Sequence, residues 1–177
     1  MADTETQRQG LRGQKSMQRR RQGFSLIELL VVVSIILIIA AIAIPNLLRS
    51  RIAANEASAV GSLRTYNTAQ ITFISTYPTV GFASSFSDLG PCSSSCGPSG
   101  AGLIDNILGS GTTGSSKAGY SFVLSTSASG GSNVIYQINA NPIVTNSTGN
   151  RYFFTDNSGV IRYNISTTAG SSDTPLQ

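Results

Sequence analysis

The sequence Gly23-Phe24-Ser25-Leu26-Ile27-Glu28-Leu29-Leu30 opens an apolar run that continues to Ile44. From Phe24 to Ile44 the run has 21 residues, of which only Ser25, Glu28 and Ser34 are polar. As a helix it is about 31 Å long, enough to cross the hydrocarbon core of a bilayer. We therefore expect this helix to organise the chain, with the residues that follow it forming a small polar domain at its end.

The net positive charge of the chain comes from the segment that precedes the run. The 177 residues carry a formal charge of +4, and residues 1–23, with six basic and two acidic side chains, account for 6 − 2 = +4. Lys and Arg beside a membrane span remain on the cytoplasmic side. We interpret residues 1–22 as a basic, unstructured leader, and the neutral remainder does not support a nucleic-acid-binding surface.

Glu28 sets the apolar run apart from ordinary membrane segments. A permanent transmembrane helix, a secretory signal cut near Ala41–Ala43 and a twin-arginine signal at Arg20-Arg21 all fit some of its features. However, the run is longer than the apolar core of a usual secretory signal. None of the three interpretations explains a carboxylate five residues into the span, which costs a few kcal/mol and usually marks a function.

The segment Gly23–Leu30, with the arginines before it and the apolar run after it, resembles the processing signal of type IV pilins and the related pseudopilins. The resemblance covers roughly residues 15 to 55 and depends on Gly23, Phe24 and Glu28, the fifth residue after the cleavage point. It implies cleavage after Gly23, N-methylation of Phe24 and polymerisation into a filament for adhesion, motility or DNA uptake.

The same resemblance implies a set of partners and locations. The partners are further copies of the chain, a prepilin peptidase and N-methyltransferase, an inner-membrane assembly platform with its ATPase, and the lipid bilayer before assembly. The chain is then expected as a single-pass inner-membrane protein first and in a cell-surface pilus afterwards, or in a periplasmic pseudopilus if it is a pseudopilin.

The chemistry of the motif suits an assembly signal. Cleavage exposes an α-amino group at Phe24, and a cation buried among apolar helices needs an anionic partner. Glu28 is the only acid in the run. We expect Glu28 of one subunit to pair with the Phe24 amine of its neighbour and thereby to fix the axial register.

The helical pattern continues beyond the apolar run. Pro45 removes one backbone hydrogen bond, so we expect a kink there. Apolar residues then recur mostly three or four positions apart, which predicts an amphipathic helix packed on a domain. These residues are Leu47, Leu48, Ile52, Ala53, Ala57, Val60, Leu63, Tyr66, Ile71 and Ile74. We expect one helix from about Ser25 to Ser75, with Arg49, Arg51 and Glu56 on a solvated face.

The last third of the chain has the alternation of β-strands. Tyr77-Pro78 ends the helix, and a Gly/Ser-rich connection holds Cys92 and Cys96, which form either a disulfide, if the domain is exported, or two free thiols. Four antiparallel strands are predicted at residues 120–124, 134–140, 151–155 and 160–165. Residues 166–177 are expected to be a polar tail or to flank a strand.

These elements predict an α+β, pilin-like fold, in which a long N-terminal helix packs on an antiparallel sheet of about four strands. The expected organisation is a leader (1–23), a hydrophobic helix (24–45), an amphipathic helix (46–76), a connecting loop (77–118) and a sheet domain (119–177).

The residue inventory argues against catalysis. The chain has no histidine, two cysteines and one lysine after residue 23, so a general base and a four-ligand zinc site both lack their usual residues. We predict no enzymatic activity, no cofactor and no metal site, and we interpret Asp156–Gly159 as a turn in preference to a calcium loop. Asn146 and Asn164 begin short glycosylation patterns that often occur by chance.

Two alternatives to a pilus subunit remain open. One is a pseudopilin of a type II secretion system, whose main pseudopilin often carries calcium ligands near its C-terminus. The other is a minor pilin or a membrane-anchored adhesin. No acidic cluster lies near this C-terminus, which favours the pilus subunit.

Overall fold

The structure is a computed structural model that describes residues 23–92, 95–112 and 114–176. The chain divides into two compact units, Met1–Ala41 and Ile42–Gln177. Helix α1 (Leu26–Thr76) contributes residues to both units. All other helices and strands of the described residues belong to the second unit.

Helix α1 has 51 residues and passes through Pro45 without a break. Its bounds confirm the expected helix from about Ser25 to Ser75 to within one residue at each end. Leu, Ile and Ala dominate its sequence, and Leu and Ala are strong helix formers. The kink expected at Pro45 stays a prediction.

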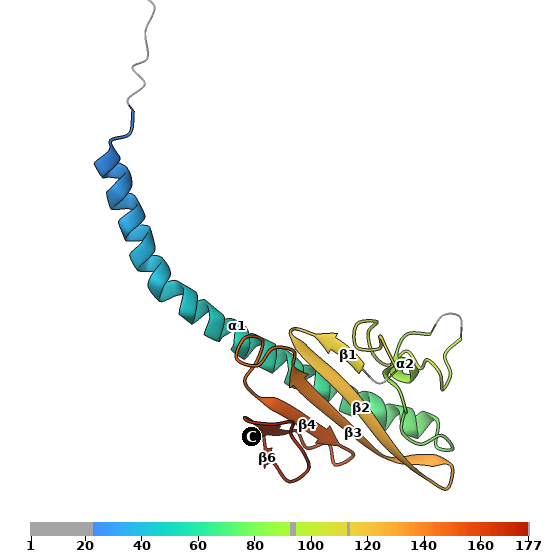
Figure 1. Cartoon of the computed structure of the whole chain (residues 1–177). Helices are drawn as coiled ribbons and strands as arrows, with labels where there is room; N and C mark the ends of the chain where they lie inside the picture. Colours follow the sequence, from blue (N-terminus) through green and yellow to red (C-terminus); the bar gives the residue numbers. More distant parts are fainter. Residues whose placement is uncertain (1–22, 93–94, 113, 177) are drawn as a thin grey trace, which may run out of the picture. The chain divides into compact units, whose positions relative to one another are not determined.

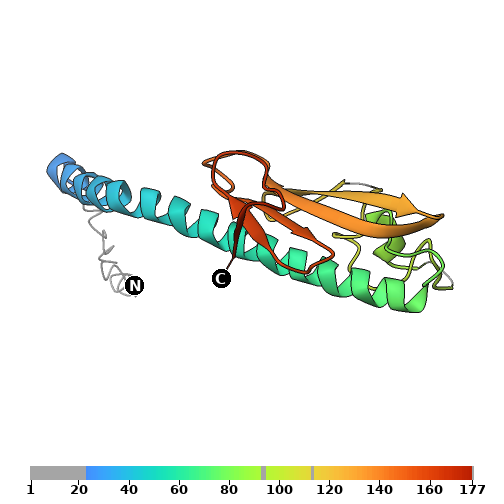
Figure 2. The ribbon, with the colours of Figure 1, turned by 90° about the horizontal axis from the view of Figure 1, so that it is seen from below.

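The second unit contains one antiparallel sheet with its strands in chain order (Figure 1). The strands are β1 (Gly114–Lys117), β2 (Tyr120–Ser129), β3 (Ser132–Pro142), β4 (Tyr152–Asp156), β5 (Arg162–Asn164) and β6 (Thr174–Pro175). The α+β, pilin-like class is confirmed, since the sheet lies along the second half of α1 (Figure 2).

The expectation of about four strands is wrong, because the sheet has six. The two additional strands, β1 and β6, are the edges, and they fall in the expected connecting loop and C-terminal tail. Neither has an alternating apolar pattern: β1 reads Gly-Ser-Ser-Lys and β6 reads Thr-Pro. Both are strands because a neighbour supplies hydrogen-bonding partners, β2 for β1 and β5 for β6.

Strands β2 and β3 form the longest pair of the sheet. Their hairpin closes at Ser129 opposite Ser132, through Gly130 and Gly131, whose φ angles are +62° and +87°. A two-residue turn of this kind needs positive φ at both positions, which glycine adopts at little cost. The hairpin thereby fixes which residues of β2 and β3 face α1.

The short helix α2 (Phe86–Leu89) lies in the connection between α1 and β1. Ser85 and Asp88 cap its start reciprocally: the Asp88 N–H donates to Ser85 Oγ at 3.1 Å, and the Ser85 N–H donates to Asp88 Oδ2 at 2.9 Å. This capping box satisfies two amides that lack partners within the helix. The helix buries Phe86 and Leu89.

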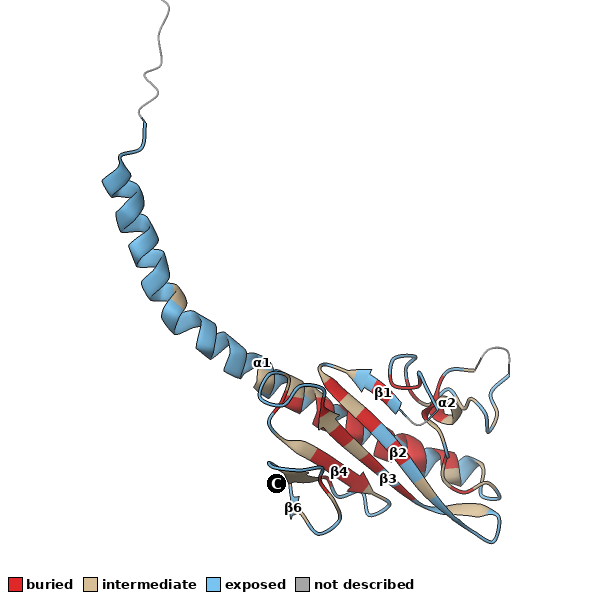
Figure 3. Ribbon diagram, in the orientation of Figure 1, coloured by how far each residue is buried: buried red, intermediate tan, exposed pale blue. Residues whose placement is uncertain are grey.

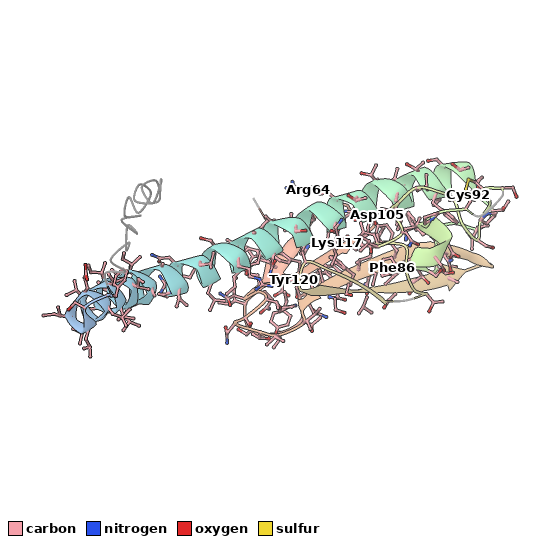
Figure 4. The ribbon with its side chains drawn as sticks, turned by 90° about the horizontal axis from the view of Figure 1, so that it is seen from above. Arg64, Phe86, Cys92, Asp105, Lys117 and Tyr120 are labelled. Atoms are coloured by element: carbon pink, nitrogen blue, oxygen red, sulfur yellow. A yellow bond between two sulfur atoms is a disulfide. The ribbon has the colours of Figure 1, made fainter. Side chains whose placement is uncertain are left out.

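The core lies between α1 and the sheet, and it begins only at Glu56 of the helix (Figure 3). The buried helix residues are Glu56, Ala59, Val60, Ser62, Leu63, Tyr66, Asn67, Ala69, Gln70 and Phe73. Tyr66 packs on Phe86 with ring centroids 4.5 Å apart, and Phe86 and Tyr120 lie between helix and sheet (Figure 4).

The expected buried face of the helix is confirmed only in part. Val60, Leu63 and Tyr66 are buried, whereas Leu47 and Ile71 are 71% and 57% exposed. The sequence pattern identified apolar residues but missed the polar members of the buried face, Asn67 and Gln70. Gln70 is buried because its side-chain amide exchanges two hydrogen bonds with the backbone of Ala83.

Candidate functional site

The start of the described chain is open at Gly23 and Phe24. Phe24 is 81% exposed, and a Cβ added at Gly23 would meet no atom within 4 Å. Nothing in the fold of the chain itself therefore requires glycine at position 23. An accessible peptide bond between Gly23 and Phe24, with no side chain on the first residue, suits a site that another macromolecule must bind.

Glu28 lies in the first turn of α1, where it is exposed. Its Oε2 accepts a hydrogen bond from the Ser25 N–H at 3.3 Å. A carboxylate at this place satisfies an unpaired amide and interacts favourably with the positive end of the helix dipole. Among the described residues no cation pairs with Glu28.

The helix presents an apolar surface that the chain does not cover. Every large apolar residue from Leu26 to Leu48 is at least 45% exposed. Within the described residues one helix, α1, is long and apolar enough to cross a membrane, with a mean hydropathy of 3.1 over its best window. An exposed apolar surface of this size marks a site of interaction with a membrane or another protein.

Glu56 is not on a solvated face, contrary to the expectation from sequence. It is only 6% exposed, and its Oε1 accepts hydrogen bonds from the N–H groups of Asn150 and Arg151, at 2.9 and 3.2 Å. Arg151 also donates from Nε to Glu56 Oε2 at 2.6 Å. A buried carboxylate is retained where donors and a cation compensate its lost hydration. Arg49 and Arg51 are exposed, as expected.

The β3–β4 connection is held against α1 at this point. The Asn55 side-chain amide donates to the Thr148 carbonyl at 2.9 Å, one residue before the Glu56 contacts. Sequence reasoning missed this junction of Asn55, Glu56 and Arg151. The signal that could have found it is the position of Glu56, since it lies three and four residues before Ala59 and Val60, on the same face of the helix.

Cys92 and Cys96 are joined by a disulfide on the connection between α2 and β1. Among the described residues, no group of three or more His, Cys, Asp or Glu side chains is placed to hold a metal. The Asp156–Gly159 segment forms a turn, in which Asp156 Oδ1 accepts from the Ser158 N–H at 2.9 Å and the Gly159 N–H donates to the Asp156 carbonyl.

A shallow groove of about 330 Å³ runs along α1 and is lined by Arg64, Thr65, Thr68, Ala69, Thr72 and Leu103. The three threonine hydroxyls all donate to helix carbonyls four residues earlier. Arg64 is the charged side chain of the groove (Figure 4). The lining includes no histidine, cysteine, lysine or carboxylate side chain.

The comparisons with known proteins match part of the chain. A family model described as "Prokaryotic N-terminal methylation motif" matches residues 18–44. The type IV major pilin protein PilA of Myxococcus xanthus (strain DK1622) is 46% identical over 56 residues, which is 32% of this chain and 26% of that protein. The match thus spans about a quarter of the relative's length. No solved structure matches the chain.

Proposed function

We propose that this chain, whose residues 18–44 match the N-terminal methylation motif, is a structural subunit of a type IV pilus-like filament. The observation that carries this proposal is the uncovered apolar surface of α1 between Phe24 and Leu48, which begins at the methylation motif. A surface of this kind serves two states: lipid covers it in the precursor, and other copies cover it in the filament.

In this proposal a prepilin peptidase cuts after Gly23 and methylates the new amine of Phe24. The open surroundings of both residues support access by such an enzyme. The assembly platform and its ATPase then move the subunit from the inner membrane into the filament, where the apolar helices pack in the core and the sheet domains form the outer surface.

Glu28 provides the register in the proposed filament. Its carboxylate has no cationic partner among the described residues and lies at the start of the helix, four residues from the Phe24 amine that cleavage would create. Pairing with the amine of a neighbouring subunit neutralises two charges that would otherwise be buried alone in an apolar core.

The second candidate is a pseudopilin of a type II secretion system. One observation concerns the loop before β6, which is closed by hydrogen bonds to the Asp173 carboxylate. The Asp173 carboxylate accepts hydrogen bonds from the Asn164 side chain at 2.9 Å and from the Gly170 N–H at 2.8 Å. Among the described residues no further acidic side chains cluster with Asp173 to form a metal-binding group, which favours the pilus subunit.

The test is the mass and the N-terminal residue of the protein in filaments sheared from cells. We expect an abundant chain that begins at Phe24 and carries one added methyl group. The same processed chain confined to the cell envelope would favour the pseudopilin or the minor, anchored subunit. A chain that keeps residues 1–23, or one cut near Ala43, would contradict both filament proposals.

A further inference from the structure

Three exposed apolar side chains gather at one end of the sheet in the second unit. Ile143 and Val144 follow the last residue of β3, and Ile165 follows the last residue of β5. They are 57%, 53% and 70% exposed. The antiparallel register places the end of β3, the start of β4 and the end of β5 together. We call Ile143, Val144 and Ile165 the basal residues.

Helix α1 meets the sheet at this same end. The Asn55 amide holds the carbonyl of Thr148 in the β3–β4 connection, and Glu56 holds the backbone of Asn150 and Arg151. The β3–β4 connection lies beside α1, opposite the β2–β3 hairpin at the far end of the sheet (Figures 1 and 2). The basal residues therefore lie at the end of the sheet that contacts Asn55 and Glu56 of α1.

The turns that carry the basal residues are built by several hydrogen bonds. The Thr148 N–H donates to the Val144 carbonyl at 2.9 Å, and the hydroxyls of Thr145 and Tyr152 lie 2.9 Å apart. Beyond β5, Asn164 Oδ1 accepts from the N–H of Ser166 at 2.8 Å. The exposed apolar side chains thus have fixed positions at this end of the sheet.

The charges at this end are positive. Arg49 and Arg51 are exposed on α1 just before the sheet begins to cover it, and no carboxylate pairs with them among the described residues. Two acids lie at this end: Glu56 is paired with Arg151, whereas Asp173 accepts from the neutral Asn164 amide and keeps its negative charge, so Arg49 and Arg51 leave a net positive charge here. The β2–β3 hairpin at the far end, residues 127–133, consists of Ser, Ala, Gly and Asn, and the half-exposed Val134 and Ile135 follow it at 45% and 40% exposure, below the 53–70% of the basal residues.

We propose that the basal end of the sheet rests on the bilayer surface while the subunit waits for assembly. The basal residues enter the boundary between headgroups and acyl chains, and Arg49 and Arg51 bind lipid phosphates. Asn55 lies seven positions after Leu48, about 10 Å along the helix, which is close to the roughly 5–8 Å depth of a headgroup layer. This inference rests on the proposed membrane-anchored precursor.

Lipid fits these features better than a second copy of the chain. Ile143 and Val144 follow β3 and Ile165 follows β5, so the basal residues come from two separate connections and not from one continuous element. A bilayer offers phosphates all around the helix, so both arginines find anions whatever the rotation of α1. A second copy would need free carboxylates at matching positions.

The absence of tryptophan from the chain permits a clean test. Full chains carrying one substitution each, Val144→Trp, Ser127→Trp or Leu37→Trp, are reconstituted in vesicles of phosphatidylethanolamine and phosphatidylglycerol, with or without brominated acyl chains. Bromine quenches only tryptophan that reaches the lipid. Leu37→Trp reports insertion of α1, Val144→Trp reports the basal end, and Ser127→Trp is the control at the far end.

We expect strong quenching for Leu37→Trp, clear quenching with a blue-shifted emission for Val144→Trp, and neither for Ser127→Trp. Equal behaviour of Val144→Trp and Ser127→Trp, with Leu37→Trp quenched, overturns the basal contact and leaves the membrane anchor intact. If Leu37→Trp is not quenched, the anchored precursor itself fails. If the emission of Val144→Trp is blue-shifted only at high protein density, and bromine does not quench it, a second copy of the chain covers the surface. That result overturns the lipid assignment.

Arg49→Gln combined with Arg51→Gln, in the Val144→Trp background, tests the phosphate contacts. We expect the two arginine substitutions to remove most of the quenching of Val144→Trp. In a separate chain that carries Leu37→Trp with the same two arginine substitutions, the quenching should remain. The matched control is Arg64→Gln, an exposed arginine of α1 farther from the basal end, which should leave the quenching of Val144→Trp unchanged. Unchanged quenching in the double variant overturns the role of the two arginines.

Discussion

Arg151 Nε lies 2.6 Å from Glu56 Oε2, and this pair joins helix α1 to the connection between β3 and β4 across 95 positions of sequence. The carboxylate side chain is 7% exposed and the arginine side chain 39% exposed. The guanidinium also lies 5.5 Å from the ring centroid of Phe153 and 5.7 Å from that of Tyr163. The pair therefore determines where the sheet begins to cover the helix.

Replacement of Glu56 by Ala should destabilise the sheet domain substantially. The change leaves two backbone N–H groups and a partly buried guanidinium without an acceptor, and we expect a loss of about 2–4 kcal/mol in the free energy of unfolding. Chemical unfolding of the full chain in detergent, followed by near-ultraviolet circular dichroism, measures it. The control is Lys117→Ala, which removes the more exposed pair with Asp105, 3.6 Å apart, and should cost less than about 1 kcal/mol. Equal losses in the two variants would contradict the buried role of Glu56.

Gly149→Ala and Gly61→Ala should change the free energy of unfolding in opposite directions. A Cβ at Gly149 would overlap the ring and hydroxyl of Tyr120, whose Oη donates to the Arg151 carbonyl at 2.7 Å. Gly149→Ala should therefore destabilise the domain by about 1–3 kcal/mol. Gly61 lies within α1, and a Cβ added there would meet no atom within 4 Å, so Gly61→Ala should stabilise by about 0.5–1 kcal/mol. Thermal unfolding of both variants checks the prediction, which fails if their signs agree.

Alkaline pH should unfold the domain through its buried tyrosines. Burial raises the pKa of Tyr136 to about 12, and it raises the pKa values of Tyr66 and Tyr120 as well. An acid whose pKa is higher in the folded state stabilises that state fully below its unfolded pKa of about 10. As the pH rises above about 10, each such group lowers stability by up to about 1.4 kcal/mol per pH unit until its folded pKa is reached.

The free energy of unfolding, measured between about pH 8 and pH 12, tests this effect. The absorbance of tyrosinate, measured at the same pH values, reports the ionisation of the tyrosines. We expect a plateau below about pH 10 and a steep fall above it. Tyr136→Phe should make the fall shallower, although it also removes a hydrogen bond to Asn67 Oδ1 at 3.1 Å. A profile that stays flat to about pH 12 would contradict the burial of these hydroxyls.

Glu28→Ala should abolish filament assembly and leave the sheet domain folded. Among the described residues the carboxylate makes one hydrogen bond, with the Ser25 N–H, so we expect its loss to cost the folded monomer little. Shearing of surface filaments followed by quantification of the chain measures assembly, and membrane fractions measure the precursor. The matched control is Ser34→Ala, which removes a hydroxyl that donates only to the Leu30 carbonyl, at 2.8 Å, and should assemble normally. Normal filaments from Glu28→Ala would refute the register role.

Local sequence was sufficient to predict the long helix and the segment that carries the motif. A run of 21 nearly uninterrupted apolar residues admits few structures other than a helix, and Gly23, Phe24 and Glu28 are read in order along the chain. The central strands were also predictable, since β2 and β3 alternate and their hairpin has two adjacent glycines. Each of these features is local, so the residues that cause it are neighbours in sequence.

The buried face of the helix and the edges of the sheet depend instead on contacts between distant parts of the chain. Strands β1 and β6 have no strand pattern of their own and exist because β2 and β5 lie beside them. Glu56 and Gln70 are buried because Arg151 and the backbone of Ala83 come from other parts of the chain to satisfy them. A polar side chain is buried where its partners are, and partners that are separated in sequence meet only once the chain has folded.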